Sequence, residues 1–214
     1  MPEDIYILGI GRNSVNIIEL ALDCGYNISG LIHFDESLTG QKYCGFKIIG
    51  SFKELLIPEF ISNKNVALSM GNIPIKKRIY DQLKKLNAIV PSLVHPTCII
   101  SRFAKIGEGV QILPGSIIEG DSEIGENTSI TVNSVIAHNV KIGTDNLISG
   151  NCMVGAYSSI GNSTHIGQGS TIVSGKVKSI GDNCILGAGS VLVSDMPSNS
   201  IFVGNPAKFL KDNN

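Results

Sequence analysis

The chain has 214 residues, a formal net charge of −1 and 43% hydrophobic residues. Such a balanced charge excludes a whole-protein electrostatic attraction to nucleic acid or to an anionic membrane surface. No stretch approaches the roughly 18 apolar residues that a membrane helix needs. We therefore expect a soluble, cytoplasmic protein that binds neither nucleic acid nor membrane. The five cysteines form no C-x-x-C pair, so neither a disulfide framework nor a metal site is expected.

Residues 1–92 show strand patterns that alternate with helix patterns, which is typical of a small parallel sheet with crossover helices. Strands are expected at residues 5–8, 30–34, 47–49 and 65–70, and helices near residues 16–22, after Ser51 and over residues 74–86. This pattern predicts a small Rossmann-like α/β domain. The basic residues of the last helix are interpreted as a solvated face: Lys76, Lys77, Arg78, Lys84 and Lys85.

Candidate ligand-binding residues follow three of these strands. They are Gly9, Gly11 and Asn13 after the first strand, Asp35 at the end of the second, and Gly71 and Asn72 after the fourth. Ligands bind at this edge of an open α/β sheet, and a Gly-x-Gly turn before a helix lets the backbone approach a phosphate. Ser14 stands where the dinucleotide fingerprint has its third glycine, which favours some other nucleotide over NAD. A tight turn without a ligand is the alternative.

From Val94 to Leu192 an apolar residue returns at every sixth position, apart from a two-residue insertion near Lys178. An α-helix cannot hold this period, because 3.6 residues per turn does not divide six. Glycine follows the apolar residue at intervals of 18 residues, at Gly107, Gly125, Gly143 and Gly161. Three hexads therefore make one turn. Residues 93–214 are predicted to form a triangular parallel β-helix of roughly six coils, followed by a short tail.

His138 is the strongest catalytic candidate. It occupies the third position of the hexad that starts at Ile136, so it projects from a coil face and not into the interior. An imidazole can accept a proton near neutral pH. A surface histidine without a function is the alternative.

With these residues in view, the chain resembles the hexapeptide-repeat acetyltransferases of nucleotide-amino-sugar metabolism. This family includes sialic acid O-acetyltransferases and nucleotide-4-amino-sugar N-acetyltransferases. The resemblance spans the chain and includes the segments 69–72, 94–96, 186–190 and 203–208. It implies a left-handed β-helix, an exception to the usual right-handed crossover. It also implies a homotrimer, acetyl-CoA as acyl donor, no metal, and a nucleotide sugar bound to the N-terminal domain.

The resemblance also implies roles for individual residues. His138 would be the base, and Asn139 would orient its ring. The residues expected to contact the cofactor are Leu147, Gly155, Ala156, Ser174, Ala188, Pro206 and Lys208. A backbone N–H near Gly155 and Ala156 would hold the developing oxyanion, and Lys208 and Lys211 would meet the CoA phosphates.

Three positions depart from the family pattern. Asn139 stands where relatives often have a carboxylate, and Leu147 where they commonly have a second histidine. The first loop reads Gly11-Arg12-Asn13-Ser14 in place of the frequent Gly-His-Gly. A hydroxyl needs a stronger base than an amine, so Asn139 favours the amine as acceptor.

The leading hypothesis is an acetyl-CoA-dependent N-acetyltransferase that acts on a nucleotide-linked amino sugar for bacterial glycan synthesis. A sugar O-acetyltransferase is one alternative. The other, from a different class, is a non-catalytic trimeric binding or scaffold protein.

Overall fold

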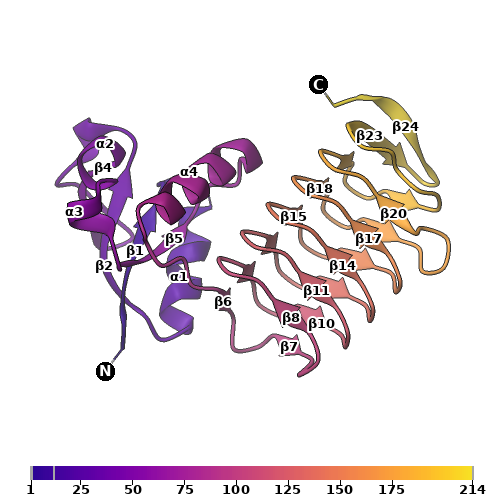
Figure 1. The fold of residues 1–214 in the computed structure, drawn as a ribbon, viewed down its shortest axis with the longest axis horizontal. Coiled ribbons are helices and arrows are strands. Elements are labelled where there is room, and N and C mark those ends of the chain that lie inside the picture. Colours follow the sequence, from indigo (N-terminus) through magenta and orange to yellow (C-terminus); the bar gives the residue numbers. More distant parts are fainter. Residues whose placement is uncertain (1, 12, 214) are drawn as a thin grey trace. The chain divides into compact units, whose positions relative to one another are not determined.

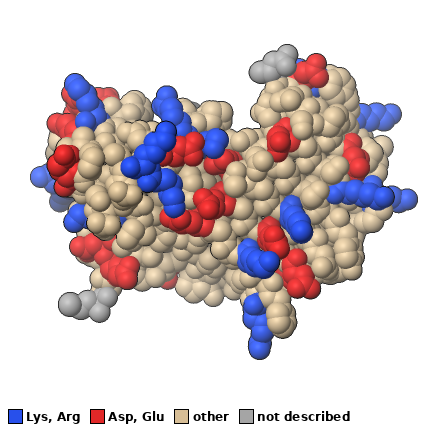
Figure 2. All heavy atoms as spheres, viewed as in Figure 1, with Lys and Arg blue, Asp and Glu red and all other residues tan. Residues whose placement is uncertain are grey.

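The computed structural model describes residues 2–11 and 13–213 (Figure 1). The chain divides into two compact units, Met1–Leu93 and Val94–Asn214. The expected boundary lies one residue earlier in the chain. No helix in the described part is long and apolar enough to cross a membrane. Over the face shown in Figure 2, basic and acidic side chains are interspersed.

The N-terminal unit is built on a five-stranded sheet in the order β3-β4-β2-β1-β5. Strands β1, β2, β4 and β5 run parallel, and β3 is antiparallel to β4. The strands are β1 Asp4–Leu8, β2 Asn27–His33, β3 Lys42–Tyr43, β4 Phe46–Ser51 and β5 Asn65–Leu68. The helices are α1 Ser14–Asp23, η1 Glu36–Leu38, α2 Phe52–Leu55, α3 Pro58–Ile61 and α4 Ile73–Lys85. The α/β class expected from the sequence is confirmed.

The sequence accounts for most of these elements. The side chains of Ile5, Ile7 and Leu8 are fully buried in β1, and Ser51 begins α2 with a capping box to Glu54. The strand predicted at residues 47–49 is β4, whereas β3, η1 and α3 were not predicted. Each is too short to produce a hydrophobic period, so only its turn residues could have signalled it.

The C-terminal unit is a left-handed parallel β-helix with three sheets, whose strands follow one another around each coil (Figure 1). The first face contains β6 Leu93–Val94, β9 Gln111–Ile112, β12 Ser129–Ile130, β15 Leu147–Ile148, β18 His165–Ile166, β21 Ile185–Leu186, β23 Ser200–Gly204 and β24 Ala207–Asp212. The second face contains β7 Ile99–Ile100, β10 Ile117–Ile118, β13 Val135–Ile136, β16 Met153–Val154, β19 Thr171–Ile172 and β22 Val191–Leu192. The third face contains β8 Lys105–Ile106, β11 Glu123–Ile124, β14 Lys141–Ile142, β17 Ser159–Ile160 and β20 Ser179–Ile180.

The apolar residue of each hexad points into the interior column. From Ile112 to Leu192 these side chains are buried. Val94, Ile100 and Ile106 are only partly buried, because their strands lie at the ends of the three sheets and pair with a coil on one side only. Residues 94–199, all of them described, contain no helix.

The glycines at 18-residue intervals stack at one corner of the β-helix. A Cβ placed on Gly125 would lie 2.5 Å from the carbonyl carbon of Gly143. Only glycine therefore lets successive coils approach this closely.

The small residues of the hexads join each coil to the next by hydrogen bonds. The hydroxyl of Ser122, for example, donates to the carbonyl of Ala137 at 2.8 Å and accepts the N–H of Val140 at 3.3 Å. Cys98 and Cys152 occupy the same hexad position, and burial raises the pKa of both thiols. These cysteines act as small core residues.

The C-terminal segment differs from the tail expected. It forms the antiparallel hairpin β23–β24, which continues the first face because β23 pairs in parallel with β21.

Candidate functional sites

A cavity of about 510 Å³ lies at the carboxyl edge of the N-terminal sheet, beside the first residues of α1 and α4. Its lining consists of Gly9, Ile10, Gly11, Asn13, Phe34, Phe52, Ser69, Met70, Gly71, Ile75 and Arg78. Four of the predicted substrate-binding residues, Gly9, Gly11, Asn13 and Gly71, are thus brought together. Arg12, in the same loop, lies outside the described residues.

Ser14 holds the first loop of this cavity in place. Its hydroxyl accepts the N–H of Gly11 at 2.6 Å, donates to the carbonyl of Gly9 at 2.9 Å and lies 3.0 Å from the hydroxyl of Ser69. Gly9 has a φ of +82°, and a Cβ there would lie 2.6 Å from Cε of Met70. The serine that departs from the dinucleotide fingerprint therefore holds this turn against Ser69, the residue that follows β5.

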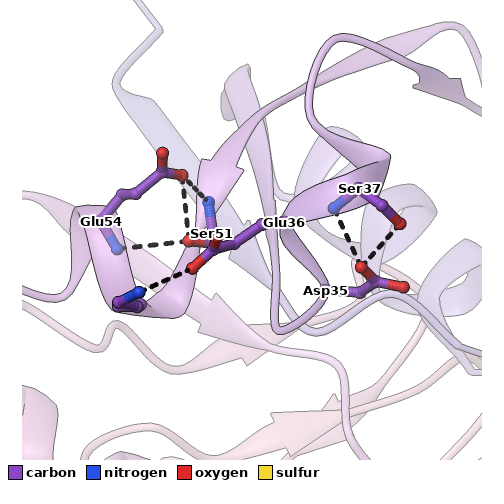
Figure 3. A network of polar contacts seen from close by, with 6 residues as sticks. Asp35, Glu36, Ser37, Ser51 and Glu54 are labelled. Atoms are coloured by element: carbon purple, nitrogen blue, oxygen red, sulfur yellow. Dashed lines mark hydrogen bonds and ion pairs between the residues drawn. The ribbon is translucent and has the colours of Figure 1, made fainter.

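Two predicted substrate-binding residues, Asp35 and Asn72, do not line the cavity. One carboxylate oxygen of Asp35 accepts the N–H of Ser37 at 2.9 Å and its hydroxyl at 2.7 Å (Figure 3). These bonds lower the pKa of the Asp35 carboxyl. The side-chain oxygen of Asn72 accepts the N–H of Ile75 at 3.0 Å. Both residues cap the start of a helical segment.

Sequence reasoning missed several residues at this cavity. Arg78 was interpreted as part of a solvated face of α4, but its side chain lines the cavity and brings a positive charge to it. Lys76, from the same basic group, is buried. Phe34, which also lines the cavity, is 71% exposed and offers an aromatic surface.

His33 joins two loops at the same edge. Its Nδ1 accepts the N–H of Asp35 at 3.0 Å, so its Nε2 carries the proton and donates to the carbonyl of Ile10 at 3.2 Å. This buried ring has a structural role beside the cavity and fixes the loop that carries Phe34.

The second site is the corner at which His138 lies, in the turn between β13 and β14. We call the turns that join the second face to the third face the His138 corner. The side chains of both His138 and Asn139 are exposed there. His138 Nδ1 lies 2.8 Å from the side-chain oxygen of Asn139. Because an amide oxygen can only accept, Nδ1 carries a proton in this bond, and in the neutral ring Nε2 is then the nitrogen with the free lone pair.

Two further residues contact His138. One is Glu119, whose carboxylate accepts the backbone N–H of His138 at 2.9 Å and thus meets the backbone of the histidine, not its ring. The other is Tyr157, whose ring centre lies 5.1 Å from that of the imidazole at an interplanar angle of 89°. Neither was predicted from the sequence.

Ala156 occupies the position on the next coil that is equivalent to the position of His138. Its backbone N–H is therefore a candidate hydrogen-bond donor beside the histidine. The N–H of Gly155 is used in the ladder, where it donates to the carbonyl of Ile172 at 3.0 Å. No hydrogen bond from the N–H of Ala156 is found among the described residues. Of the two donors considered, Ala156 is therefore the one able to serve an oxyanion. Ser174, on the following coil, donates to the carbonyl of Ala156 at 3.4 Å.

The remaining predicted cofactor residues lie on the first face of the β-helix. Leu147 is in β15, Ala188 follows β21, and Pro206 and Lys208 belong to the β23–β24 hairpin. In a triangular coil the first face lies opposite the His138 corner. One protomer therefore does not bring these residues together with His138.

His165 lies beside Leu147 on the next coil of the first face. Its Nε2 lies 2.9 Å from the hydroxyl of Ser149, and burial lowers the pKa of its ring. Among the described residues, no group of three or more His, Cys, Asp and Glu side chains could hold a metal ion.

Comparison with known proteins bears on both units. Residues 103–138 match the family described as bacterial transferase hexapeptide (six repeats). A search of curated protein sequences finds no match. A variant of perosamine N-acetyltransferase from Caulobacter crescentus, solved with CoA and GDP-perosamine, is 23% identical with a TM-score of 0.89, over 98% of this chain and 97% of that chain.

Two other solved structures are similar over nearly the whole chain. The acetyltransferase domain of PglB from Neisseria gonorrhoeae, in complex with acetyl coenzyme A, is 25% identical with a TM-score of 0.87, over 98% of this chain and 100% of that chain. WeeI from Acinetobacter baumannii is 21% identical with a TM-score of 0.85, over 97% of this chain and 100% of that chain. The chain therefore carries the bacterial transferase hexapeptide repeat and has the fold of the hexapeptide-repeat acetyltransferases.

Proposed function

We propose that this protein transfers the acetyl group of acetyl-CoA to the amine of a nucleotide-linked amino sugar, in bacterial glycan synthesis. The observation that carries the proposal is the exposed ring of His138, whose bond from Nδ1–H to Asn139 selects the neutral tautomer in which Nε2 is the proton acceptor. The similar proteins bound to CoA, acetyl-CoA or GDP-perosamine support the same chemistry.

The residues of the His138 corner suit a direct transfer. Nε2 of His138 takes a proton from the sugar amine as the nitrogen attacks the thioester carbonyl. The N–H of Ala156 stabilises the negative charge that develops on the carbonyl oxygen. When the carbon–sulfur bond breaks, the imidazolium returns its proton to the departing thiolate. Asn139 orients the ring but supplies no charge, which suits an amine better than a hydroxyl acceptor.

The cavity of the N-terminal unit is our proposed site for the nucleotide. Its volume of about 510 Å³ lies within the range of small-molecule sites. The first residues of α1 and α4 direct backbone N–H groups toward this edge, and Arg78 adds a positive charge for phosphate. Phe34 offers a surface on which a base can stack.

We further propose that the active enzyme is a homotrimer. The outward side chains of the second face are mostly apolar: Ile99, Ile117, Val135, Met153, Thr171 and Val191. Those of the third face are charged or polar: Lys105, Glu123, Lys141, Ser159 and Ser179. An apolar face suits a protein–protein contact. Packing there places another copy beside His138, and that copy's first face can complete the cofactor site.

The test is a panel of UDP-, dTDP- and GDP-linked amino sugars incubated with acetyl-CoA, with released thiol and product mass as readouts. We expect thiol release with at least one amino sugar and none with the matched sugar that carries a hydroxyl in place of the amine. Mild alkali distinguishes the products, because it cleaves an acetyl ester but leaves an acetamide intact. An alkali-labile product would indicate O-acetylation, and binding of sugar and acetyl-CoA without thiol release would indicate a non-catalytic protein.

A further inference from the structure

The turns of the β-helix share an unusual backbone conformation. One residue in nearly every turn has a positive φ, and these residues are Gly109, Gly115, Asp121, Asn127, Asn133, Asn139, Asp145, Asn151, Tyr157, Ser163, Gly169, Gly175, Asn183, Gly189 and Asn199. Glycine, asparagine and aspartate are the residues that tolerate this conformation best. Among these described residues, Tyr157 alone is large.

The position of Tyr157 is equivalent to that of Asn139 on the coil before and of Gly175 on the coil after. The φ values are 57° for Asn139, 63° for Tyr157 and 71° for Gly175. A bulky side chain in this region is strained, and such strain persists where the surroundings or the function demand it.

The hydrogen bonding of this turn shows the same strain. In ten of these turns the N–H of the positive-φ residue donates to a carbonyl of the previous coil at 2.8 to 3.0 Å, from Asn127, Asn133, Asn139, Asp145, Asn151, Ser163, Gly169, Asn183, Gly189 and Asn199. From Tyr157 to the carbonyl of His138 the distance is 3.4 Å. The bond from Tyr157 is thus longer than the bond made by each of those ten residues.

Core packing does not account for this tyrosine. Its side chain is 68% exposed, so it buries little apolar surface in the protomer. The aromatic contact that it makes is the edge-to-face one with His138, at 5.1 Å between ring centres. The strained residue therefore holds its ring against the imidazole that carries the proposed base.

We propose that Tyr157 is a positioning residue for His138, an inference that rests on the proposed function. The bond from Nδ1 to Asn139 leaves the imidazole free to pivot about one contact. The ring of Tyr157, nearly perpendicular to the imidazole, blocks that pivot and keeps Nε2 directed toward the acceptor amine. The strained conformation at Tyr157 is retained because it places the tyrosine ring against the imidazole.

The experiment replaces Tyr157 with asparagine, the residue found at the equivalent position one coil earlier. We expect Tyr157→Asn to relieve the strain and raise Tm by about 2 to 4 °C. Because an edge-to-face contact is lost, kcat on the identified sugar should fall about 3- to 10-fold while KM for acetyl-CoA stays unchanged. Tyr157→Phe keeps the ring and should retain wild-type kcat.

Two further variants make the result specific. Ser163→Asn introduces the same residue at an equivalent turn in another corner, and should change neither kcat nor KM. In a His138→Ala background, Tyr157→Asn should cause no further loss of the residual rate. An unchanged kcat in Tyr157→Asn, or an equal loss with and without His138, overturns the inference. Wild-type turnover in His138→Ala alone would instead overturn the proposed function.

Discussion

The side-chain oxygens of Asp35 and Asn72 each cap the helical segment that follows a strand of the N-terminal sheet. Both lie at the ends of strands where ligands bind, but the same oxygen that would meet a ribose also caps a helix, and the sequence cannot separate these uses. Predicting that Arg78 lines the cavity would have required knowing which side of α4 faces the edge of the sheet. Tyr157 could have been found, because a tyrosine among asparagine, aspartate and glycine turn residues breaks the hexad pattern.

Arg78 gives a prediction about substrate binding. Arg78→Gln removes the positive charge from the cavity of the N-terminal unit, so KM for the nucleotide sugar should rise by about tenfold or more, with kcat nearly unchanged. Steady-state kinetics with the sugar varied is the measurement. Lys85→Gln, the same change at the far end of α4, is the matched control. If Arg78→Gln and Lys85→Gln behave alike, the nucleotide does not occupy this cavity.

His165 gives a prediction about stability and pH. Burial lowers the pKa of its ring, so the folded state favours the neutral form. Above an unfolded pKa of about 6.5 neither state is protonated, whereas below it the unfolded chain takes up the proton first and stability falls. Between about pH 7.5 and pH 5.5, wild-type Tm should fall more than that of His165→Gln. Parallel Tm curves for the two proteins would exclude this contribution.

At the scale of elements, the six-residue period determined the β-helix and the position of its interior column. That signal is strong because every coil repeats the same packing. A polar residue at an interior position would disrupt the packing against both neighbouring coils. The C-terminal hairpin β23–β24 lies beyond the repeat and has no such signal. The same limit applies to the β3–β4 hairpin, whose first strand has only two residues.

The interior column can be tested with one charge. Ile130 is fully buried, so Ile130→Asp should cost at least about 3 kcal/mol of unfolding free energy and disturb assembly. Ser159→Asp, on the outward side of a strand and paired in register with Lys141, is the control and should be nearly neutral. Chemical denaturation of both variants is the measurement. Equal stability would contradict the assignment of inward and outward positions.

At the scale of the whole molecule, the proposed cofactor site depends on assembly of several protomers. Met153 lies on the apolar second face and is 40% exposed in the protomer. Met153→Lys should therefore convert a trimer into monomers at micromolar concentration, whereas Ser159→Lys on the third face should not. Sedimentation equilibrium distinguishes these outcomes. A wild-type monomer at micromolar protein would remove the shared cofactor site.

Ligand binding provides a second test of the same interface. Acetyl-CoA should raise Tm of the wild type as its concentration increases, since it binds the folded assembly. The Met153→Lys monomer should show a much smaller shift, because its cofactor site is incomplete. An equal shift in both proteins would place the cofactor within one protomer.

The central claim is that Nε2 of His138 takes the proton from the acceptor amine. The most direct measurement is kcat of His138→Ala on the identified sugar, with acetyl-CoA affinity measured by calorimetry on the same preparation. General-base catalysis is worth about 100- to 10,000-fold, so kcat should fall within that range while the affinity stays nearly unchanged. Near-wild-type turnover in His138→Ala would show that the amine arrives deprotonated or that another residue is the base, and would contradict the account.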